Sequence, residues 1–245
     1  MTSSAGRAAR AVRLRYRVLA NRGADVECPI CEHRFARFRD DWNRPNAICW
    51  RCGSHERHRA LWLYLEGNPE LLSGTSELLH FAPEWCLERR FRALPALRYV
   101  TADLQPGAAE LQIDITRIAL GDASFGAILC SHVLEHVEDD AAAMRELHRV
   151  LAPGGWLIVM VPLDLAREQT YEDASVSTPA AREREFLQHD HVRLYSPDIA
   201  ERLGAAGLAV STERVARDLG PEAVARYGLL DADYLFVCRR VSPTG

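Results

Sequence analysis

The chain has 245 residues, 48% of them hydrophobic, and a formal net charge of −4, which is enough apolar material for one large domain and a small module. All 30 basic residues are arginines, which excludes chemistry that needs a lysine, such as Schiff-base catalysis. The longest strongly apolar run, Trp156 to Leu163, is far shorter than the roughly 20 residues of a membrane span, and no apolar segment follows the basic N-terminus, so we expect a cytoplasmic protein without a membrane span.

The first part of the chain carries the positive charge. Residues 1–62 have a formal net charge of +7, whereas the remaining residues have a formal net charge of −11. Residues 1–24 are expected to form a basic helix in which no acidic residue occurs before Asp25. Such a segment favours contact with nucleic acid, an anionic surface or a partner protein, although a solvated helix explains the same charge.

Residues 25–56 contain two Cys-x-x-Cys pairs, and 17 residues separate the pairs. This spacing is typical of a structural zinc site in a chain that forms no disulfide framework. We therefore predict a zinc-ribbon-like module whose Zn²⁺ has four thiolate ligands and is closed to substrate. The ligands are Cys28, Cys31, Cys49 and Cys52. The alternative, four free core cysteines, fits less well because the segment has no other core.

A connecting helix is expected over residues 57–75, and strands then alternate with helices through residues 76–245. Ser196 is expected to be the N-cap of one of the later helices, with Pro197 at its first helical position. This alternation predicts a doubly wound α/β fold, with a mainly parallel seven-stranded sheet and a ligand at the carboxyl ends of its strands. The expected strands are 78–82, 97–102, 111–114, 125–130, 156–161, 208–215 and 232–239, and the other expected helices are 84–94 and 139–151.

Residues 163–195 interrupt this alternation. A connection in such a fold usually has ~2–6 residues, and this one is far longer. Because it leaves from the carboxyl end of a strand, we expect it to form a substrate lid over the ligand.

The ends of the expected strands carry a set of motifs typical of one family. Asp103 follows the second strand, Asp114-Ile115 the third and Ser131-His132 the fourth, and Leu151-Ala-Pro-Gly-Gly155 precedes the fifth. In these motifs, and in His132-Val-Leu-Glu-His-Val137, the chain resembles the class I S-adenosylmethionine-dependent methyltransferases of the type 11 group, which have a Rossmann-like sheet. The resemblance covers residues 76–162 well and 196–240 in outline. It implies S-adenosylmethionine as cofactor, with contacts from Phe81, Ala82, Pro83, Glu84, Asp103, Leu104, Asp114, Ile115, Ser131 and His132.

The loop after the first strand departs from the family pattern, which is rich in glycine. Here it reads His80-Phe-Ala-Pro-Glu84, as in related bacterial zinc-module methyltransferases that the chain resembles. We predict that Glu84 pairs with the amino group of the cofactor; alternatively, it only favours the start of a helix. Asp103 and Asp114 have a similar alternative, because aspartates at strand ends commonly cap a turn or helix. Their joint spacing favours cofactor contact.

The end of the expected lid, His189-Asp-His-Val-Arg-Leu-Tyr195, offers polar side chains for catalysis. We predict that His191, next to Asp190, is the general base for a hydroxyl acceptor, with His132 as the rival. Arg193 is predicted to bind a carboxylate or phosphate of the substrate, and Tyr195 to stack on it or donate a hydrogen bond. The alternative is a buried polar network that only fixes the lid in place.

The sequence therefore predicts an enzyme that methylates a small polar metabolite or sugar, with oxygen favoured over nitrogen and carbon as the acceptor atom. A second hypothesis is an RNA-directed methyltransferase that docks through the zinc module and the arginine-rich helix, although the acidic balance of the remaining chain argues against it. A third is a cofactor-binding scaffold without catalysis.

Overall fold

The computed structural model describes residues 4–42 and 44–241, which fold as two compact units. Each unit is assembled from several segments of the chain. The first comprises Met1–Asn68, Glu84–Arg90 and Arg214–Asp233, and the second Pro69–Pro83, Phe91–Glu213 and Tyr234–Gly245. Two segments that the sequence placed in the methyltransferase domain, 84–90 and 214–233, thus pack with the cysteine-containing segment. Among the described residues, no helix is long and apolar enough to cross a membrane.

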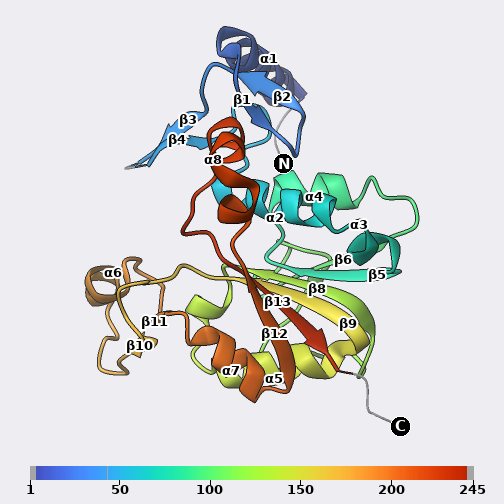
Figure 1. The fold of residues 1–245 in the computed structure, drawn as a ribbon, viewed down its shortest axis with the longest axis vertical. Coiled ribbons are helices and arrows are strands. Elements are labelled where there is room, and N and C mark those ends of the chain that lie inside the picture. The colour runs from blue at the N-terminus through green and yellow to red at the C-terminus, as the bar shows by residue number, and fades with distance from the viewer. Residues whose placement is uncertain (1–3, 43, 242–245) are drawn as a thin grey trace. The chain divides into compact units, whose positions relative to one another are not determined.

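The first unit combines helices with two small antiparallel hairpins (Figure 1). Its arginine-rich helix carries no acidic residue in its first turn, as the sequence predicts for this segment. The elements are α1 (Ser4–Ala20), the hairpin of β1 (Arg22–Cys28) and β2 (His33–Phe35), the hairpin of β3 (Arg39–Asp41) and β4 (Arg44–Ile48), α2 (Glu56–Gly67), most of α4 (Trp85–Phe91), and α8 (Val215–Tyr227).

Arg59 of α2 joins three segments of the first unit. Its side chain is fully buried, and its guanidinium lies 4.2 Å from the ring centroid of Phe38. A buried guanidinium requires acceptors for its N–H groups, and here four backbone carbonyls accept hydrogen bonds of 2.6–2.9 Å. Because these carbonyls belong to Ala47, Ser54, Tyr227 and Gly228, one side chain connects β4, the second cysteine pair and the end of α8.

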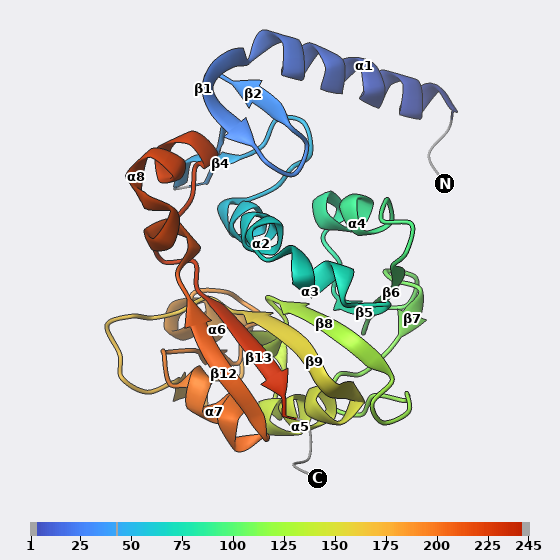
Figure 2. The same ribbon diagram turned by 45° about the vertical axis from the view of Figure 1, so that its right-hand side comes forward.

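The second unit is built on a seven-stranded sheet with the order β12-β13-β9-β8-β5-β6-β7. Five strands run parallel, and β13 pairs antiparallel with both of its neighbours. Figure 2 shows the central strands side by side. The strands are β5 (Glu77–Phe81), β6 (Arg98–Asp103), β7 (Leu111–Gln112), β8 (Phe125–Ser131), β9 (Leu151–Met160), β12 (Leu208–Glu213) and β13 (Leu235–Arg240). The predicted fold class, a mainly parallel Rossmann-like sheet, is confirmed.

Side chains of the central strands alternate between the two faces of the sheet. Leu157 and Val159 of β9 join a cluster with Met144 and Leu147 of α5 (Asp140–Val150), whereas Trp156 is buried outside that cluster. The indole N–H of Trp156 donates to the carbonyl of Leu71 in α3 (Pro69–Ser73) across 3.0 Å. Both faces of the strand are therefore covered, which explains why parallel strands of this kind are continuously apolar in sequence.

Several elements differ from the sequence expectation. Helix α7 (Ile199–Ala205) has Asp198 rather than Ser196 as its N-cap residue, so the prediction for Ser196 was wrong by two residues. Strand β9 begins at Leu151, because the Pro-Gly-Gly segment continues the strand instead of preceding it. Helix α8 was not predicted at all. The segment expected to be a lid contains β10 (Tyr171–Glu172), α6 (Pro179–Phe186) and β11 (Arg193–Leu194).

Candidate functional site

A cavity of about 690 Å³ opens at the carboxyl ends of β5, β6, β7 and β8. Strand β5 lies between β6 and β8. The strands that follow β5 are therefore added first on one side of it and then on the other, so the strand order reverses at β5. Such a reversal leaves a crevice where parallel sheets bind ligands. The lining residues are Phe81, Ala82, Asp103, Leu104, Gln105, Ile113, Asp114, Ile115, Thr116, His132, Val133, His136, Val137, Glu138, Asp139 and Asp190.

Two lining residues have a left-handed backbone conformation directly after a strand. Ala82 follows β5 with φ 47°, and His132 follows β8 with φ 53°. The backbone N–H of Ala82 donates to the carbonyl of Ala102, and that of His132 to the carbonyl of Met160. A residue with a Cβ atom adopts this conformation at a cost, and such costs cluster at functional sites. At this turn the family that the chain resembles has a glycine-rich loop. Here Ala82 adopts the left-handed conformation instead of a glycine.

The two aspartates singled out in the sequence line the cavity and also stabilise their own turns. Oδ1 of Asp103 accepts the backbone N–H of Gln105 across 2.8 Å. Oδ1 of Asp114 accepts the backbone N–H and the hydroxyl of Thr116 across 2.9 and 2.7 Å, and these bonds lower the pKa of Asp114. Capping a turn and contacting a cofactor are thus compatible roles for these aspartates, because the turns hold both carboxylates at the edge of the cavity.

The structure brings together most of the residues predicted to contact the cofactor. Seven of them line the cavity: Phe81, Ala82, Asp103, Leu104, Asp114, Ile115 and His132. Pro83, Glu84 and Ser131, all within the described part of the chain, do not line it. Several lining residues were not predicted from the sequence, among them Gln105, Thr116 and Val133. Each directly follows a predicted residue, so including the next residue after each strand-end motif would have found them.

Glu84 belongs to the first unit, where its side chain lies close to a histidine of α2. Oε1 of Glu84 is 3.3 Å from Nε2 of His58, and the Glu84 side chain is 16% exposed. The backbone carbonyl of Glu84 accepts hydrogen bonds from the first turn of α4, so the residue also begins a helix. Its pairing with a cofactor amino group stays a prediction.

Two histidines on the cavity wall each lie beside a carboxylate. Nδ1 of His132 is 3.1 Å from Oε1 of Glu135, and Nδ1 of His136 is 3.4 Å from Oδ2 of Asp190. Asp190, the sequence neighbour of His191, therefore pairs with His136. His191 is only 6% exposed and lies behind the wall, with its ring 4.8 Å from that of His136.

Arg193 and Tyr195 do not line the cavity and belong to a buried polar network at the end of the segment 163–195. The guanidinium of Arg193 is 3% exposed and donates to the carbonyls of Leu134, Val137 and Glu138. It also pairs with the Glu172 carboxylate at 3.0 Å. Four of the five N–H groups of Arg193 are thus bonded within the protein, which favours the alternative of a buried polar network, and the substrate contact stays a prediction.

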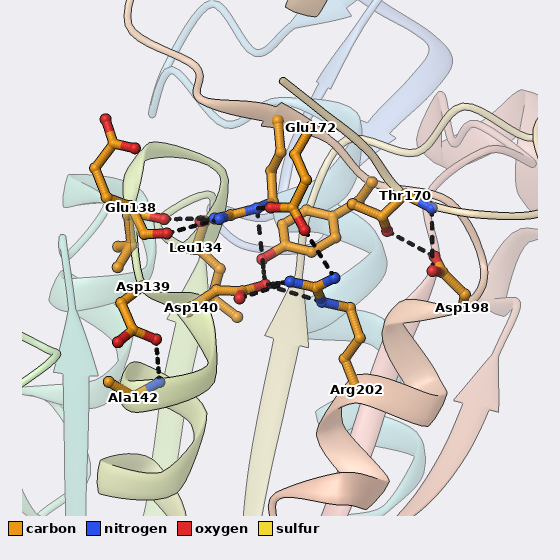
Figure 3. A network of polar contacts seen from close by, with 12 residues as sticks. Leu134, Glu138, Asp139, Asp140, Ala142, Thr170, Glu172, Asp198 and Arg202 are labelled. Atoms are coloured by element: carbon orange, nitrogen blue, oxygen red, sulfur yellow. Dashed lines mark hydrogen bonds and ion pairs between the residues drawn. The ribbon is translucent and has the colours of Figure 1, made fainter. Parts of the chain in front are cut away.

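Tyr195 belongs to the same network. Its side chain is fully buried, and its hydroxyl donates to Oδ2 of Asp140 across 2.6 Å. Arg202 of α7 donates to both oxygens of that carboxylate at 2.7 Å (Figure 3). Burial alone would raise the pKa of Asp140, but the hydrogen bonds from Arg202 and Tyr195 outweigh burial and hold the pKa below its usual value.

The four cysteines of the two Cys-x-x-Cys pairs converge in the first unit. Sγ of Cys28 lies 3.6 Å from Sγ of Cys52, and Sγ of Cys31 lies 3.6 Å from Sγ of Cys49. Four sulfur atoms bound to Zn²⁺ at about 2.3 Å in a tetrahedron lie about 3.8 Å apart. The arrangement therefore fits a tetrathiolate zinc site, and it leaves no ligand position for substrate.

Comparisons with known proteins match part of the chain to one family. Residues 85–159 match the family described as "Methyltransferase domain". Two demethylmenaquinone methyltransferases, from Mycobacterium sp. strains KMS and JLS, are 33% identical over 75 residues, which is 31% of this chain and 31% of each relative. The chain thus aligns with about a third of the length of these curated relatives.

Solved structures share the fold at low sequence identity. The [4+2]-cyclase SpnF is 15% identical with a TM-score of 0.53, over 94% of this chain and 93% of that one. The 1,6-didemethyltoxoflavin-N1-methyltransferase of Burkholderia thailandensis is 16% identical with a TM-score of 0.51, over 76% of this chain and 79% of that one; its structure holds S-adenosylhomocysteine. These similarities establish the sheet and its connections.

Proposed function

We propose that this chain, which carries a class I S-adenosylmethionine-dependent methyltransferase domain, transfers the methyl group of S-adenosylmethionine to a hydroxyl oxygen of a small polar metabolite or sugar. The observation that supports this most is the cavity at the carboxyl ends of β5 to β8, whose wall holds the strand-end motifs that the family resemblance implies. Asp103 would accept hydrogen bonds from the ribose hydroxyls, and Asp114 with Ile115 would contact the adenine.

The charge of the cavity supports this choice of ligands. Five acidic residues line it, and no arginine does among the residues that the structure describes. Carboxylates favour a positively charged sulfonium and accept hydrogen bonds from hydroxyl groups, whereas they repel phosphates and carboxylates. We therefore propose a neutral, hydroxyl-bearing acceptor. The acidic residues are Asp103, Asp114, Glu138, Asp139 and Asp190.

The cofactor supplies an activated methyl group when it is bound, so the protein has to align the acceptor and remove its proton. His132 is the proposed proton acceptor. It follows β8 in a left-handed conformation, lines the cavity, and has Glu135 beside Nδ1. This replaces His191 as the favoured base, because His191 lies behind the wall. His136, with Asp190 beside it, is placed to orient the acceptor.

The proposal is tested by following a labelled methyl group from S-adenosylmethionine into metabolite pools. Label in a low-molecular-weight product supports it, and label in RNA alone contradicts it. With the acceptor identified, His132→Asn should lower kcat at least ~100-fold, as expected for the loss of a general base. His189→Asn is the matched control, because that histidine is 67% exposed and lies outside the cavity lining.

An RNA acceptor is the second candidate, and α1 is the observation that favours it. The helix exposes Arg10, Arg13, Arg15 and Arg17 and carries no acidic residue in its first turn. Phosphate contacts make binding steeply salt-dependent, so RNA binding that weakens at least tenfold between 50 and 200 mM salt would favour it. A scaffold without catalysis would be favoured by failure to bind S-adenosylmethionine.

We further propose that Cys28, Cys31, Cys49 and Cys52 bind one structural Zn²⁺. The sulfur separations support this assignment, as does the burial of three of the four side chains. The ion would stabilise the two hairpins, which are too small to fold on a hydrophobic core of their own.

A further inference from the structure

Three metal-binding side chains meet directly behind the cavity wall. Glu135 and His136 come from the short 3₁₀ helix Leu134–His136, and His191 comes from the lid. One ligand atom of each lies within 4.8 Å of the other two. The backbone N–H of Val192 donates to the carbonyl of Glu135 across 2.9 Å, which holds the two segments together.

Glu135 is a buried acid whose carboxylate lacks the usual hydrogen bonds. The residue is 1% exposed, and within the described part of the chain neither Oε1 nor Oε2 accepts a hydrogen bond. Nδ1 of His132 lies 3.1 Å from Oε1 of Glu135, but without hydrogen-bond geometry. An ionised carboxylate in this position costs several kcal/mol unless it is paired or binds a metal. A bound cation would offset that cost.

The hydrogen bonds of the two histidines leave Nε2 available as a ligand. Nδ1 of His191 lies 3.1 Å from the carbonyl oxygen of Phe186, and Nδ1 of His136 lies 3.3 Å from that of Asp190. A carbonyl oxygen only accepts hydrogen bonds, so Nδ1 carries the proton in each neutral ring and Nε2 carries the lone pair. Metal-binding histidines are held by this kind of outer hydrogen bond.

We propose that Glu135, His136 and His191 bind a divalent transition-metal ion through one carboxylate oxygen and two Nε2 atoms. Two imidazoles and one carboxylate favour zinc or iron(II) over magnesium or calcium, which prefer oxygen ligands. Ligands about 2.1 Å from one ion lie about 3.4 Å apart, and the ligand atoms of the three residues already lie within 4.8 Å of one another.

The proposed metal site lies next to the cavity. Three protein ligands leave a coordination position for water or for an oxygen of a bound molecule, as in catalytic zinc sites. His136 is the ligand that also lines the cavity, so the proposed metal site lies next to the space for the acceptor. This inference goes beyond the proposed methyl transfer and does not depend on it.

Metal content tests the proposal on the full-length protein. After loading with Zn²⁺ and dialysis, we expect two zinc ions per chain, one at the four cysteines and one at this site. Glu135→Gln and His191→Asn should each retain one ion. His189→Asn, which changes an exposed histidine of the same segment, should retain two. One ion per chain in the wild type, or two in both ligand variants, would overturn the proposal.

Two further measurements keep the test decisive if a variant folds poorly. Zinc X-ray absorption of the wild type should include nitrogen and oxygen neighbours as well as sulfur, and sulfur alone contradicts the site. In the Co²⁺-loaded variants, the thiolate-to-metal absorption bands should persist because the cysteine site is unchanged. Calorimetry with S-adenosylhomocysteine on the same samples separates failure of this inference from failure of the proposed function.

Discussion

The hydroxyl of Tyr195 donates to Oδ2 of Asp140 across 2.6 Å and thereby joins the end of the lid to the first turn of α5. Both side chains are buried, and Arg202 completes the pairing of the carboxylate from α7. The end of the segment 163–195 is therefore held by this network, next to the wall that carries His136 and Asp190.

Replacing Tyr195 with phenylalanine should destabilise the second unit by about 2 kcal/mol, because it removes a buried hydrogen bond to a charged group. Urea unfolding measures the change. Tyr16→Phe is the matched control, since that side chain is 73% exposed and should change stability by less than about 0.5 kcal/mol. Equal stability of Tyr195→Phe and the wild type would contradict the network.

The pH dependence of stability should reveal the lowered pKa of Asp140. A carboxyl with a lowered folded-state pKa contributes stability that is complete above its unfolded pKa of about 3.9 and is lost as pH falls through the folded value. The difference in unfolding free energy between the wild type and Asp140→Asn should thus be constant from pH 7 to 5 and shrink below pH 4. A difference that stays constant down to pH 3 would argue against this role.

If the four cysteines bind zinc as proposed, removing it should loosen the two hairpins, because the ion joins the two Cys-x-x-Cys pairs. We expect chelation, or Cys49→Ser, to raise amide hydrogen exchange across residues 22–54. Cys238→Ala serves as the control, since that cysteine is buried in β13 away from the cluster. Unchanged exchange in residues 22–54 after zinc removal would show that the hairpins fold without metal.

Long apolar runs and strand-end motifs made the sheet predictable. Buried strands such as β8 and β9 are continuously apolar, and Asp103, Asp114 and His132 follow strands whose carboxyl ends meet at one edge. Helix α8 escaped prediction because it contains Gly220-Pro221, where Gly220 has φ 81° and the helix is kinked. Glycine followed by proline usually marks the end of a helix, not its middle.

Side-chain pairing within the site was less predictable than the position of the site. Asp190 pairs with His136, which is 54 residues away, and not with the adjacent His191. Neighbouring residues in a loop often point in different directions, so adjacency in sequence does not imply contact. For Arg193 and Tyr195 the sequence left open a substrate contact or a buried polar network, and the fold identifies their partners as backbone carbonyls and Asp140.

The most direct test of the proposed function is calorimetry of the zinc-loaded protein with S-adenosylhomocysteine. We predict binding at one site, weakened roughly 10- to 100-fold by Asp103→Asn, because a hydrogen bond to a charged group contributes about 1.5–3 kcal/mol. The substituted amide keeps an oxygen for the Gln105 turn, and Asp218→Asn, on the exposed surface of α8, should bind like the wild type. The absence of binding heat with both S-adenosylhomocysteine and S-adenosylmethionine would contradict the proposal.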